Sequence, residues 1–552
     1  PGTVAEKSLR RAAGGIGLAV LASRLLGLVR EVVFTTLFGA GRELDAFIAA
    51  FRIPNLLRDL FAEGALSAAF VSTFSRKLDR EGEPAAWRLA SLVMNDLLLV
   101  VGAIVLVGIA FSPGVVAVVA PGFEEDPGKL ELTVSLTRLL FPFLLLVTLA
   151  AVAMGVLNAR SVFGIPASAS SFFNLGSILG GIAFAWLLSP GYVESVFRVG
   201  FGGGAVDGAG APAALVGMAL GTLLGGALQF LVQVPALRRV GFRYRWSAGF
   251  TDPGVREVLR LMGPATIGIA AVQVNVVVNT IFASGLGDGP VSWLSVAFRL
   301  MYLPIGMFGV ALGTVVLPSV SRAASRDDLP AFREKIAEAL QLLLFLCIPA
   351  AVGLAVAAEP IIGLIYEHGR FDASDTHAAG LALAAYSIGL TGYASIKVLG
   401  PAFFALNDTR IPMAVSLLSV AVNLALNWMA VRVFHLGHGG LALSTSLVAL
   451  WNSALLFLFL RRKIGTLPRG LGPSSLRVLG AAAAMGIACR AWIDWLGPGG
   501  GGSMHHLRVV ATTVPLGVAF FAVAGWILAV PEVRKLAGFR RVLTPPGGRP
   551  TP

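Results

Sequence analysis

The stretch from Leu21 to Arg76 carries charged side chains in a segment apolar enough to enter a bilayer. They include Arg24, Arg30, Glu31, Asp45, Arg52, Arg58, Asp59 and Glu63. A charge at bilayer depth costs about 2.5 to 3.5 kcal/mol on insertion scales, so such residues usually face a bundle interior or a wet cavity. We therefore interpret this stretch as the functional centre of the chain.

The spacing of these charges places them on shared helix faces. Arg24 and Glu31 are seven residues apart, and Asp45, Arg52 and Asp59 repeat at the same interval. Two such stripes can face one cavity. A purely structural interpretation is mutual neutralisation, in which an arginine of the first stripe pairs with one of these carboxylates and locks the two helices together.

Cations without neighbouring carboxylates favour a different interpretation. Arg299 and Lys397 lie inside apolar runs of the second half of the chain, with no acidic residue beside them in sequence. Snorkelling to an interface is the alternative for Arg299. A cluster of guanidinium groups suits an anion that carries phosphate, because arginine can clamp phosphate with two parallel hydrogen bonds.

Two helix-breaking residues in the charged stretch predict that its second helix bends. Pro54 removes a backbone donor near the middle of the second helix, and Gly64 loosens the next turn. Pro304 follows Arg299 in the same way in the second half.

Paired asparagines lie in two of the apolar runs. Asn275 and Asn279, and likewise Asn423 and Asn427, are four residues apart and share a helix face. Interhelical hydrogen bonding is the default interpretation of such amides. A sodium site is the alternative, built from Asn279, Asn423, Asn427 and Thr445.

The composition predicts a polytopic membrane protein. Of the 552 residues, 56% are hydrophobic and 13% are charged. The net charge of +13 does not indicate nucleic-acid binding, because the basic residues fall in short loops between apolar runs rather than in one patch. No phosphate-cradling GxxxxGK[ST] motif and no enzyme signature occur, so we expect a transporter that is passive or ion-coupled rather than an enzyme.

Apolar runs long enough to cross about 30 Å of hydrocarbon predict an all-α fold of about fourteen transmembrane helices. The predicted cores are 14–38, 44–75, 89–111, 132–157, 166–190, 212–236, 255–284, 290–318, 337–366, 376–404, 411–434, 439–461, 474–496 and 505–530. The positive-inside rule then places both termini in the cytoplasm. Few basic residues fall on the opposite side, namely Arg42, Lys129, Arg198, Arg370, Arg432 and Arg508.

A motif that occurs twice indicates an internal duplication of the chain. Ala50-Phe51-Arg52 is followed by Ser75-Arg76, and Ala297-Phe298-Arg299 is followed at nearly the same distance by Ser321-Arg322. The two places are equivalent in successive six-helix sets, which predicts two pseudo-twofold lobes with a substrate site between them. The predicted domains are an N-lobe at 1–240, a C-lobe at 241–465, and two C-terminal helices with the tail at 466–552.

At these residues the sequence resembles the MurJ/MviN family, the lipid II flippases within the multidrug/oligosaccharidyl-lipid/polysaccharide exporter superfamily. The matching motifs are Ser23-Arg24-x-x-Gly27-x-x-Arg30-Glu31, Phe38-Gly39-Ala40-Gly41, Asp45-Ala46-Phe47, Pro54-Asn55-Leu56-Leu57-Arg58, Phe61-Ala62-Glu63-Gly64-Ala65, Gly309 to Ser321, and Lys397-Val398-Leu399. The resemblance implies two six-helix lobes around a cationic cavity, alternating access, and a groove at the last two helices for the polyprenyl tail.

By the same resemblance, Arg24, Arg52 and Arg299 are the expected diphosphate contacts, supported by Asn55, Arg58 and Lys397. Gating or structural roles fall to Arg30, Glu31, Asp45, Pro54, Asp59 and Glu63. The implied protein lies in the bacterial cytoplasmic (inner) membrane as a monomer. Its expected partners are lipid II, membrane lipids and other cell-wall synthesis proteins, and it needs no cofactor beyond sodium or the membrane potential as driver.

Our hypothesis is therefore a flippase that moves undecaprenyl-diphosphate-linked lipid II from the cytoplasmic to the outer leaflet. Three alternatives stay open at this point. A flippase for another polyprenyl-diphosphate glycan would share the charge pattern. An ion-coupled exporter of cationic drugs would need an acidic cavity, and a non-transporting scaffold would tolerate loss of the three arginines.

Overall fold

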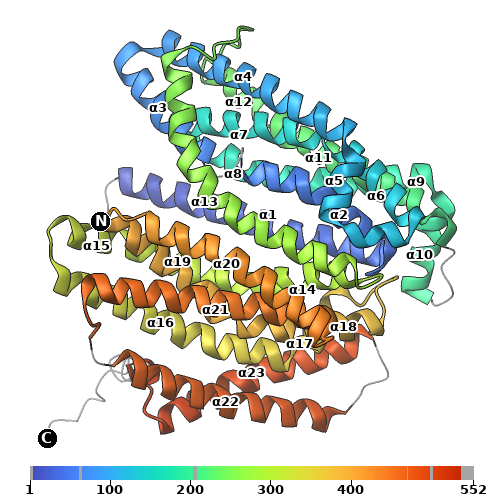
Figure 1. The fold of residues 1–552 in the computed structure, drawn as a ribbon, viewed down its shortest axis with the longest axis vertical. Helices are drawn as coiled ribbons and strands as arrows, with labels where there is room; N and C mark the ends of the chain where they lie inside the picture. The colour runs from blue at the N-terminus through green and yellow to red at the C-terminus, as the bar shows by residue number, and fades with distance from the viewer. Residues whose placement is uncertain (1–3, 61–64, 203–207, 469, 498–501, 536–552) are drawn as a thin grey trace, which may run out of the picture. The chain divides into compact units, whose positions relative to one another are not determined.

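A computed structural model describes residues 4–60, 65–202, 208–468, 470–497 and 502–535. These residues form helices joined by short turns, and no strand occurs among them (Figure 1). Within the described ranges, ten helical segments are long and apolar enough to cross a membrane, and a bent helix pair would make eleven. The prediction of an all-α polytopic membrane protein is confirmed, and the count of fourteen spans stays a prediction.

The chain divides into two compact units. Unit 1 comprises residues 1–292 and 368–372, and unit 2 comprises residues 293–367 and 373–552. This division differs from the predicted domains in three ways. The helix at 253–284 and the segment 368–372 group with unit 1, and the last two helices group with unit 2.

Unit 1 contains the charged stretch that opened the sequence analysis. Its main helices are α1 (Val4–Phe38), α2 (Arg42–Arg58), α3 (Ala65–Glu81), α4 (Glu83–Ala110), α5 (Ser112–Val119), α6 (Pro127–Leu140), α7 (Phe143–Ala159), α8 (Gly164–Leu175), α9 (Gly181–Leu188), α10 (Pro190–Gly202), α11 (Ala211–Leu231), α12 (Val234–Arg239) and α13 (Pro253–Ser284). Short 3-10 helices occupy η2 (Pro121–Glu125) and η4 (Gly208–Gly210), and a π-helix, η3 (Gly176–Gly180), joins α8 to α9.

Several helices of unit 1 begin where the sequence supplies a cap. Asp126 accepts a hydrogen bond from the Lys129 amide (3.1 Å) at the start of α6, and Asp252 accepts one from the Gly254 amide (2.8 Å) at the start of α13. Each cap is followed by proline at the first helical position, where a missing amide proton costs nothing.

A row of glycines on α11 fixes the centre of unit 1. Gly217, Gly221 and Gly225 are four residues apart on one face. A Cβ built at Gly221 would lie 2.2 Å from the amide nitrogen of Gly181 on α9, and one at Gly225 would lie 2.4 Å from the carbonyl oxygen of Phe173 on α8. Only glycine permits this approach of backbones, which is a common way of packing helices in membranes.

Unit 2 holds the remaining helices. They are α14 (Pro290–Pro304, whose first three residues belong to unit 1), α15 (Ala311–Ser325), α16 (Leu329–Val356), α17 (Ala358–Tyr366), α18 (Ala373–Ile388), α19 (Leu390–Ala405), α20 (Arg410–Trp428), α21 (Gly437–Ile464), α22 (Leu471–Leu496) and α23 (Ser503–Ile527). The π-helices η5 (Ile305–Val310) and η6 (Met429–Val433) follow α14 and α20. Helices α22 and α23 pack side by side and α22 also packs on α16 (Figure 1).

The helix boundaries agree with the predicted cores except at breaks. The predicted run 337–366 is two helices, because α16 ends at Val356 and α17 begins at Ala358. The run 376–404 is a pair, α18 and α19, bent by 43°. The run 44–75 corresponds to α2 and α3, and residues 61–64 between them lie outside the described residues.

Candidate functional site

Helix α1 presents the first cationic face of unit 1. Arg24 is exposed and makes no ion pair with a described residue. The helix is held at this point by Asn174 of α8, whose side-chain amide donates a hydrogen bond to the Ser23 carbonyl oxygen (3.0 Å). Arg30 lies over the Phe173 ring at 4.9 Å, a distance typical of a cation–π contact. Neighbouring residues of α8 therefore position both arginine-bearing turns of α1.

Helix α2 carries the second set of predicted residues. Arg52, Asn55 and Arg58 are half-buried, and Pro54 is buried inside the helix. Arg58 pairs with the adjacent Asp59 at 2.8 Å. Gln273 of α13 donates to the other Asp59 oxygen (2.5 Å), so this carboxylate is engaged by two partners. Glu63, a predicted gating residue, lies outside the described residues.

Asp45 is fully buried at the start of α2. Its Oδ1 accepts hydrogen bonds from the Ser292 amide (2.8 Å) and the Ser292 hydroxyl (2.6 Å). Its Oδ2 accepts from the Gly289 amide (2.8 Å) and from Lys129 Nζ (3.1 Å). Four donors satisfy this carboxylate, and it lies beside the first turn of α14, where the helix dipole favours a negative charge.

Lys129 is the residue at this end of unit 1 that the sequence reasoning missed. Its side chain is 3% exposed and also pairs with Asp288 (2.7 Å) and lies 4.2 Å from the Phe123 ring centroid. The positive-inside rule predicts that Lys129 lies on the side opposite the cytoplasm. The sequence did contain a signal for it. Lys129 is one of the few basic residues on the non-cytoplasmic side, where a basic residue is not explained by the positive-inside rule.

The short segment 368–372 belongs to the same end of unit 1. The Arg370 amide donates to the Thr36 carbonyl oxygen of α1 (2.9 Å), and its guanidinium donates to the Tyr192 hydroxyl (3.1 Å) and lies 3.6 Å from a Glu43 oxygen. Tyr192 donates in turn to the Leu37 carbonyl oxygen (2.5 Å). Burial raises the pKa of Tyr192, so this phenol stays protonated as a donor.

In unit 2, the two predicted cations lie on α14 and α19. Arg299 and Lys397 are both half-buried, and Lys397 makes no ion pair with a described residue. Phe298, next to Arg299, packs edge-on against Tyr386 and Tyr393 at 5.4 and 6.0 Å between ring centroids. A Cβ at Gly313 would lie 2.5 Å from the Lys397 carbonyl oxygen, so α15 packs closely against α19 here.

The asparagines predicted as a possible sodium site fall in both units. Asn423 and Asn427 are buried on α20, in line with the buried Ser419. Thr445 is buried on the adjacent α21, and its hydroxyl donates to the Leu441 carbonyl oxygen (2.9 Å). Asn279 is half-buried on α13 in unit 1. Their amide and hydroxyl oxygens are ligands of the kind that a hard cation accepts.

The arrangement decides between the two interpretations of the charged stretch for two of the three carboxylates. Asp45 is engaged by Lys129 and Asp59 by Arg58, so neither acts as the neutralising partner of Arg24. What α1 offers at Arg24 is thus an exposed guanidinium group on a rigid helix. Such a group can bind an anion but supplies no acid, base or nucleophile for bond making.

Comparisons with known proteins identify relatives across most of the chain. The family model described as lipid II flippase MurJ matches residues 34–504. A lipid II flippase MurJ of Burkholderia cenocepacia is 34% identical over 532 residues, covering 94% of this chain and 97% of the relative. A probable lipid II flippase MurJ of Vibrio cholerae is 35% identical over 450 residues, covering 80% of this chain and 81% of the relative.

Solved structures agree with the sequence comparison. A structure described as lipid II flippase MurJ in an inward closed conformation matches with a TM-score of 0.73 and 25% identity, covering 93% of this chain and 99% of that one. A multidrug-resistance MATE transporter of the MOP superfamily matches with a TM-score of 0.60 and 15% identity, over 80% and 94% of the two chains, which shows a shared fold alone. The chain therefore belongs to the MurJ family of lipid II flippases.

Proposed function

We propose that this protein translocates lipid II, the undecaprenyl-diphosphate-linked precursor of peptidoglycan, from the cytoplasmic to the outer leaflet of the bacterial inner membrane. The residues that would bind the diphosphate head are Arg24, Arg52 and Arg299, with Asn55, Arg58 and Lys397 in support. The lobes then rock to give alternating access while the polyprenyl tail stays in lipid beside α22 and α23.

One observation carries this proposal beyond family membership. Asp45 of α2 and Asp59, the residue that follows α2, are predicted counter-ions of Arg24, but they have other partners, Lys129 for Asp45 and Arg58 for Asp59. Arg24 is exposed and makes no ion pair with a described residue. A buried diphosphate needs cations because desolvating the bare anion costs several kcal/mol. A cationic site on α1 suits that cargo and opposes a cationic drug.

The rest of the expected setting follows from this role. Both termini lie in the cytoplasm, the protein acts as a monomer, and it hands lipid II to the cell-wall enzymes that use it on the outer face. Sodium or the membrane potential drives the cycle, with Asn279, Asn423, Asn427 and Thr445 as the residues available to a sodium ion.

The test uses bacteria that are depleted of their own lipid II flippase and express this chain. Lipid II exposed on the cell surface is measured for the parent, Arg24→Ala and Arg24→Lys. We expect the parent to restore exposure, Arg24→Ala to lower it at least about tenfold, and Arg24→Lys to keep part of it, because one charge-assisted contact contributes about 1.5 to 3 kcal/mol.

Arg198→Ala is the matched control, because Arg198 is an exposed arginine of α10, a helix that carries none of the proposed contacts. It should behave as the parent. A well-expressed parent that restores no exposure would contradict the proposed cargo, and an Arg24→Ala variant as active as the parent would contradict the proposed contact.

A further inference from the structure

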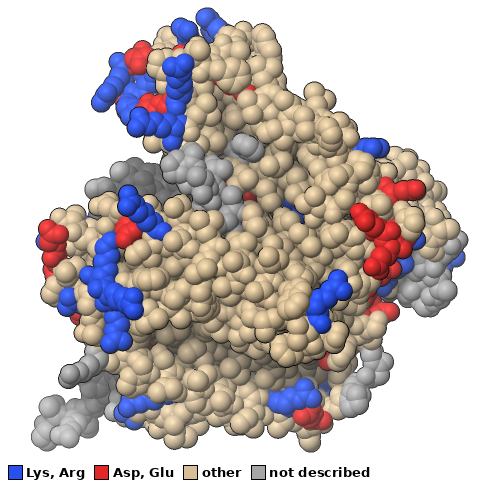
Figure 2. Space-filling model, in the orientation of Figure 1, with Lys and Arg blue, Asp and Glu red and all other residues tan. Residues whose placement is uncertain are grey.

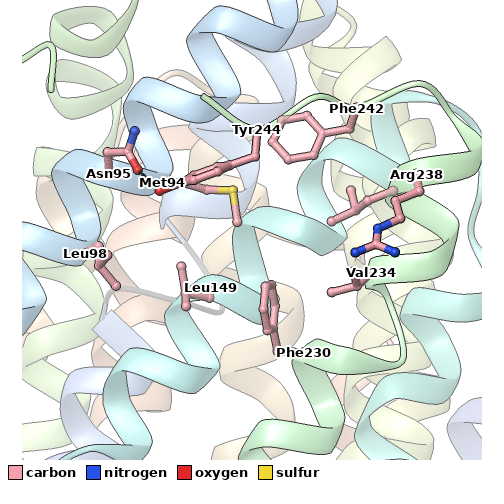
Figure 3. Close-up of a pocket in the computed structure, with 10 residues that line it drawn as sticks. Met94, Asn95, Leu98, Leu149, Phe230, Val234, Arg238, Phe242 and Tyr244 are labelled. Atoms are coloured by element: carbon pink, nitrogen blue, oxygen red, sulfur yellow. Dashed lines mark hydrogen bonds between the residues drawn. The ribbon is translucent and has the colours of Figure 1, made fainter. Parts of the chain in front are cut away.

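Unit 1 contains a cavity of about 340 Å³ that the proposed transport site does not use. It is enclosed by α4, α7, the end of α11, α12 and the segment 242–244 (Figure 3). Its volume lies at the lower end of the range of about 300 to 1,000 Å³ that is typical of small-molecule sites. The cavity lies beside the middle of the candidate membrane span 83–110 and at the C-terminal end of the candidate span 208–239.

The cavity has an apolar floor and a polar rim. Leu98, Leu149 and Phe230 line one side, away from the segment 242–244, whereas Arg238 and Tyr244 line the other (Figure 3). Arg238 is exposed, lies in the last turn of α12, and makes no ion pair with a described residue. A ligand that joins a hydrocarbon chain to an anionic group would fit such a cavity, with the chain against the apolar floor and the anionic group at Arg238.

The wall of this rim is fixed in place by α4. Asn95 donates hydrogen bonds to the carbonyl oxygens of Arg245 and Ser247 (2.9 Å each) and accepts one from the Tyr244 hydroxyl (2.5 Å). The Arg245 amide donates to the Ser91 hydroxyl (3.2 Å). The rim is therefore preformed, which reduces the entropy that a ligand would lose by ordering it.

The chain from residue 242 to residue 250, which includes this rim, has the composition of a membrane-interface anchor. Tyr244, Trp246 and Phe250 are 51%, 65% and 46% exposed, although aromatic side chains are costly to leave in water. Arg243 and Arg245 alternate with them and are exposed as well. Exposed Trp and Tyr next to several arginines are typical of a chain that lies at the lipid headgroups of an anionic leaflet.

Figure 2 shows lysines and arginines gathered at the end of unit 1 that carries α3 and α4. By the positive-inside rule this is the cytoplasmic end. Four arginines lie in the eight residues 238–245, at the rim of the cavity. They are Arg238 and Arg239 of α12, and Arg243 and Arg245. Four to eight basic residues just beyond a span are a recognised lipid-binding pattern.

We propose that this cavity binds an anionic phospholipid of the inner leaflet as a resident lipid distinct from the cargo. The phosphate lies at Arg238, and one acyl chain enters the apolar floor between Leu98, Leu149 and Phe230. The exposed aromatic residues of the segment 244–250 lie among the neighbouring headgroups.

A second cavity in unit 1 shows what a less suitable site looks like. It lies between α9 and α10, and its arginine, Arg198, has Glu194 beside it in the lining. A carboxylate four residues before an arginine on a helix offsets the charge that an anion would need. Of these two cavities, the one at Arg238 has an arginine in its lining and no carboxylate.

The experiment is a lipid titration of the purified full chain followed by native mass spectrometry. Phosphatidylglycerol and phosphatidylcholine with identical acyl chains are compared with glycerol 3-phosphate, the soluble headgroup. We expect phosphatidylglycerol to bind at least about tenfold more tightly than the other two. Arg238→Ala should remove that preference, a loss of about tenfold or more, because a charge-assisted contact is lost.

Two further variants separate a cavity from a diffuse basic surface. Arg239→Ala removes the adjacent exposed arginine, which does not line the cavity, and should weaken binding about fivefold at most, the usual effect of one surface charge. Leu98→Trp fills the floor and keeps every charge, so it should abolish the tight binding. Leu149→Phe narrows the same floor from α7 and serves if Leu98→Trp does not fold.

The proposal is overturned by any of three results. Equal losses for Arg238→Ala and Arg239→Ala would mean diffuse attraction to the basic surface. Glycerol 3-phosphate binding as tightly as phosphatidylglycerol would mean a free phosphate site. Unchanged lipid binding in folded floor variants would mean that no acyl chain enters the cavity.

Discussion

Asp45 illustrates how a charge at bilayer depth can belong to the structure rather than to the cargo site. Its two oxygens accept four hydrogen bonds, and Lys129, 3% exposed, supplies the opposite charge. Breaking a buried ion pair by removing one partner costs about 3 to 5 kcal/mol, because the other charge is left uncompensated.

We therefore expect Asp45→Asn to lower the free energy of unfolding of unit 1 by about 3 kcal/mol. The replacement keeps the size of the side chain but removes the charge and leaves buried Lys129 with Asp288 as its remaining ionic partner. Thermal unfolding of the purified protein, followed by the loss of helical signal, measures the effect.

Arg42→Ala is the control for this prediction. Arg42 pairs with Asp126 at 2.9 Å on the same end of unit 1, but both side chains are 42% exposed, so the loss should stay below about 1 kcal/mol. Equal losses for the two variants would show that Asp45 has no special structural role.

Asp408 provides a pH-dependent contribution to stability in unit 2. A hydrogen bond from Lys463 Nζ (2.6 Å) lowers the pKa of Asp408 below its ordinary value of 3.8. A carboxyl whose folded pKa is depressed stabilises the fold above its ordinary pKa, and this contribution disappears as the pH falls through the lower folded pKa.

Asp408→Asn should therefore flatten the dependence of thermal stability on pH below about pH 4, with little change of slope at neutral pH. The comparison is a series of melting curves of parent and variant from pH 2 to pH 7, an interval of about five units that extends below the ordinary pKa of an aspartate. An unchanged slope in the acid range would show that Asp408 does not contribute in this way.

At the scale of elements, the glycine row of α11 sets the position of α8 and α9. Helix α8 carries Phe173, which contacts Arg30, and Asn174, which donates to the Ser23 carbonyl oxygen. By positioning α8, the glycine row therefore also positions the cationic face of α1. A side chain at Gly221 would collide with the backbone at Gly181.

Gly221→Leu should separate α11 from α9 and destabilise unit 1 by about 3 kcal/mol or more, through overpacking at a backbone contact. Gly102→Leu is the matched control, because no atom lies within 4 Å of a Cβ built at Gly102 on α4. Detergent-solubilised yield and melting temperature report the difference. A Gly221→Leu protein as stable as the Gly102→Leu protein would contradict the packing account.

Sequence patterns predicted the helices well and their breaks poorly. Hydropathy measures the length of an apolar run, and a run continues through Ala357 and through Gly389, where the structure ends one helix and begins another. The glycine row of α11 was also not recognised, although its four-residue spacing is visible in the sequence. Breaks and close approaches depend on what packs against the run, which one chain's hydropathy does not contain.

The contacts of the predicted site residues could not be predicted from the sequence. The sequence singled out Asp45 and Asp59, yet their partners, Lys129 and Gln273, are 84 and 214 residues away along the chain. Interactions at such separations arise from the tertiary fold. The motif residues could be singled out by their types and spacing, whereas the partners of Asp45 and Asp59 became visible only in the structure.

At the scale of the whole molecule, the proposed cycle moves charge across the membrane. The charge of the cationic site cancels over one cycle, because the site moves outward and then returns. The net charge moved is that of the anionic head, and an inside-negative potential favours its outward movement. Each elementary charge contributes about 2.3 kcal/mol per 100 mV, so the complete cycle gains from the potential.

We accordingly expect lipid II translocation in proteoliposomes to accelerate severalfold when a potassium diffusion potential, negative on the donor side, is imposed. Exchange of sodium for potassium in separate experiments without a potential tests the Asn423, Asn427 and Thr445 group. A rate that follows sodium and ignores the potential would assign the driving force to those residues instead.

Transfer of labelled lipid II between the leaflets of proteoliposomes that contain only this protein decides whether the chain translocates its proposed cargo. An impermeant reagent detects the fraction of head groups that has crossed, for the parent, Arg24→Ala and Arg198→Ala. The account predicts transfer by the parent and by Arg198→Ala, and at least about tenfold slower transfer by Arg24→Ala. Transfer by Arg24→Ala at the parent's rate, or no transfer by a folded parent protein under an imposed potential, would contradict it.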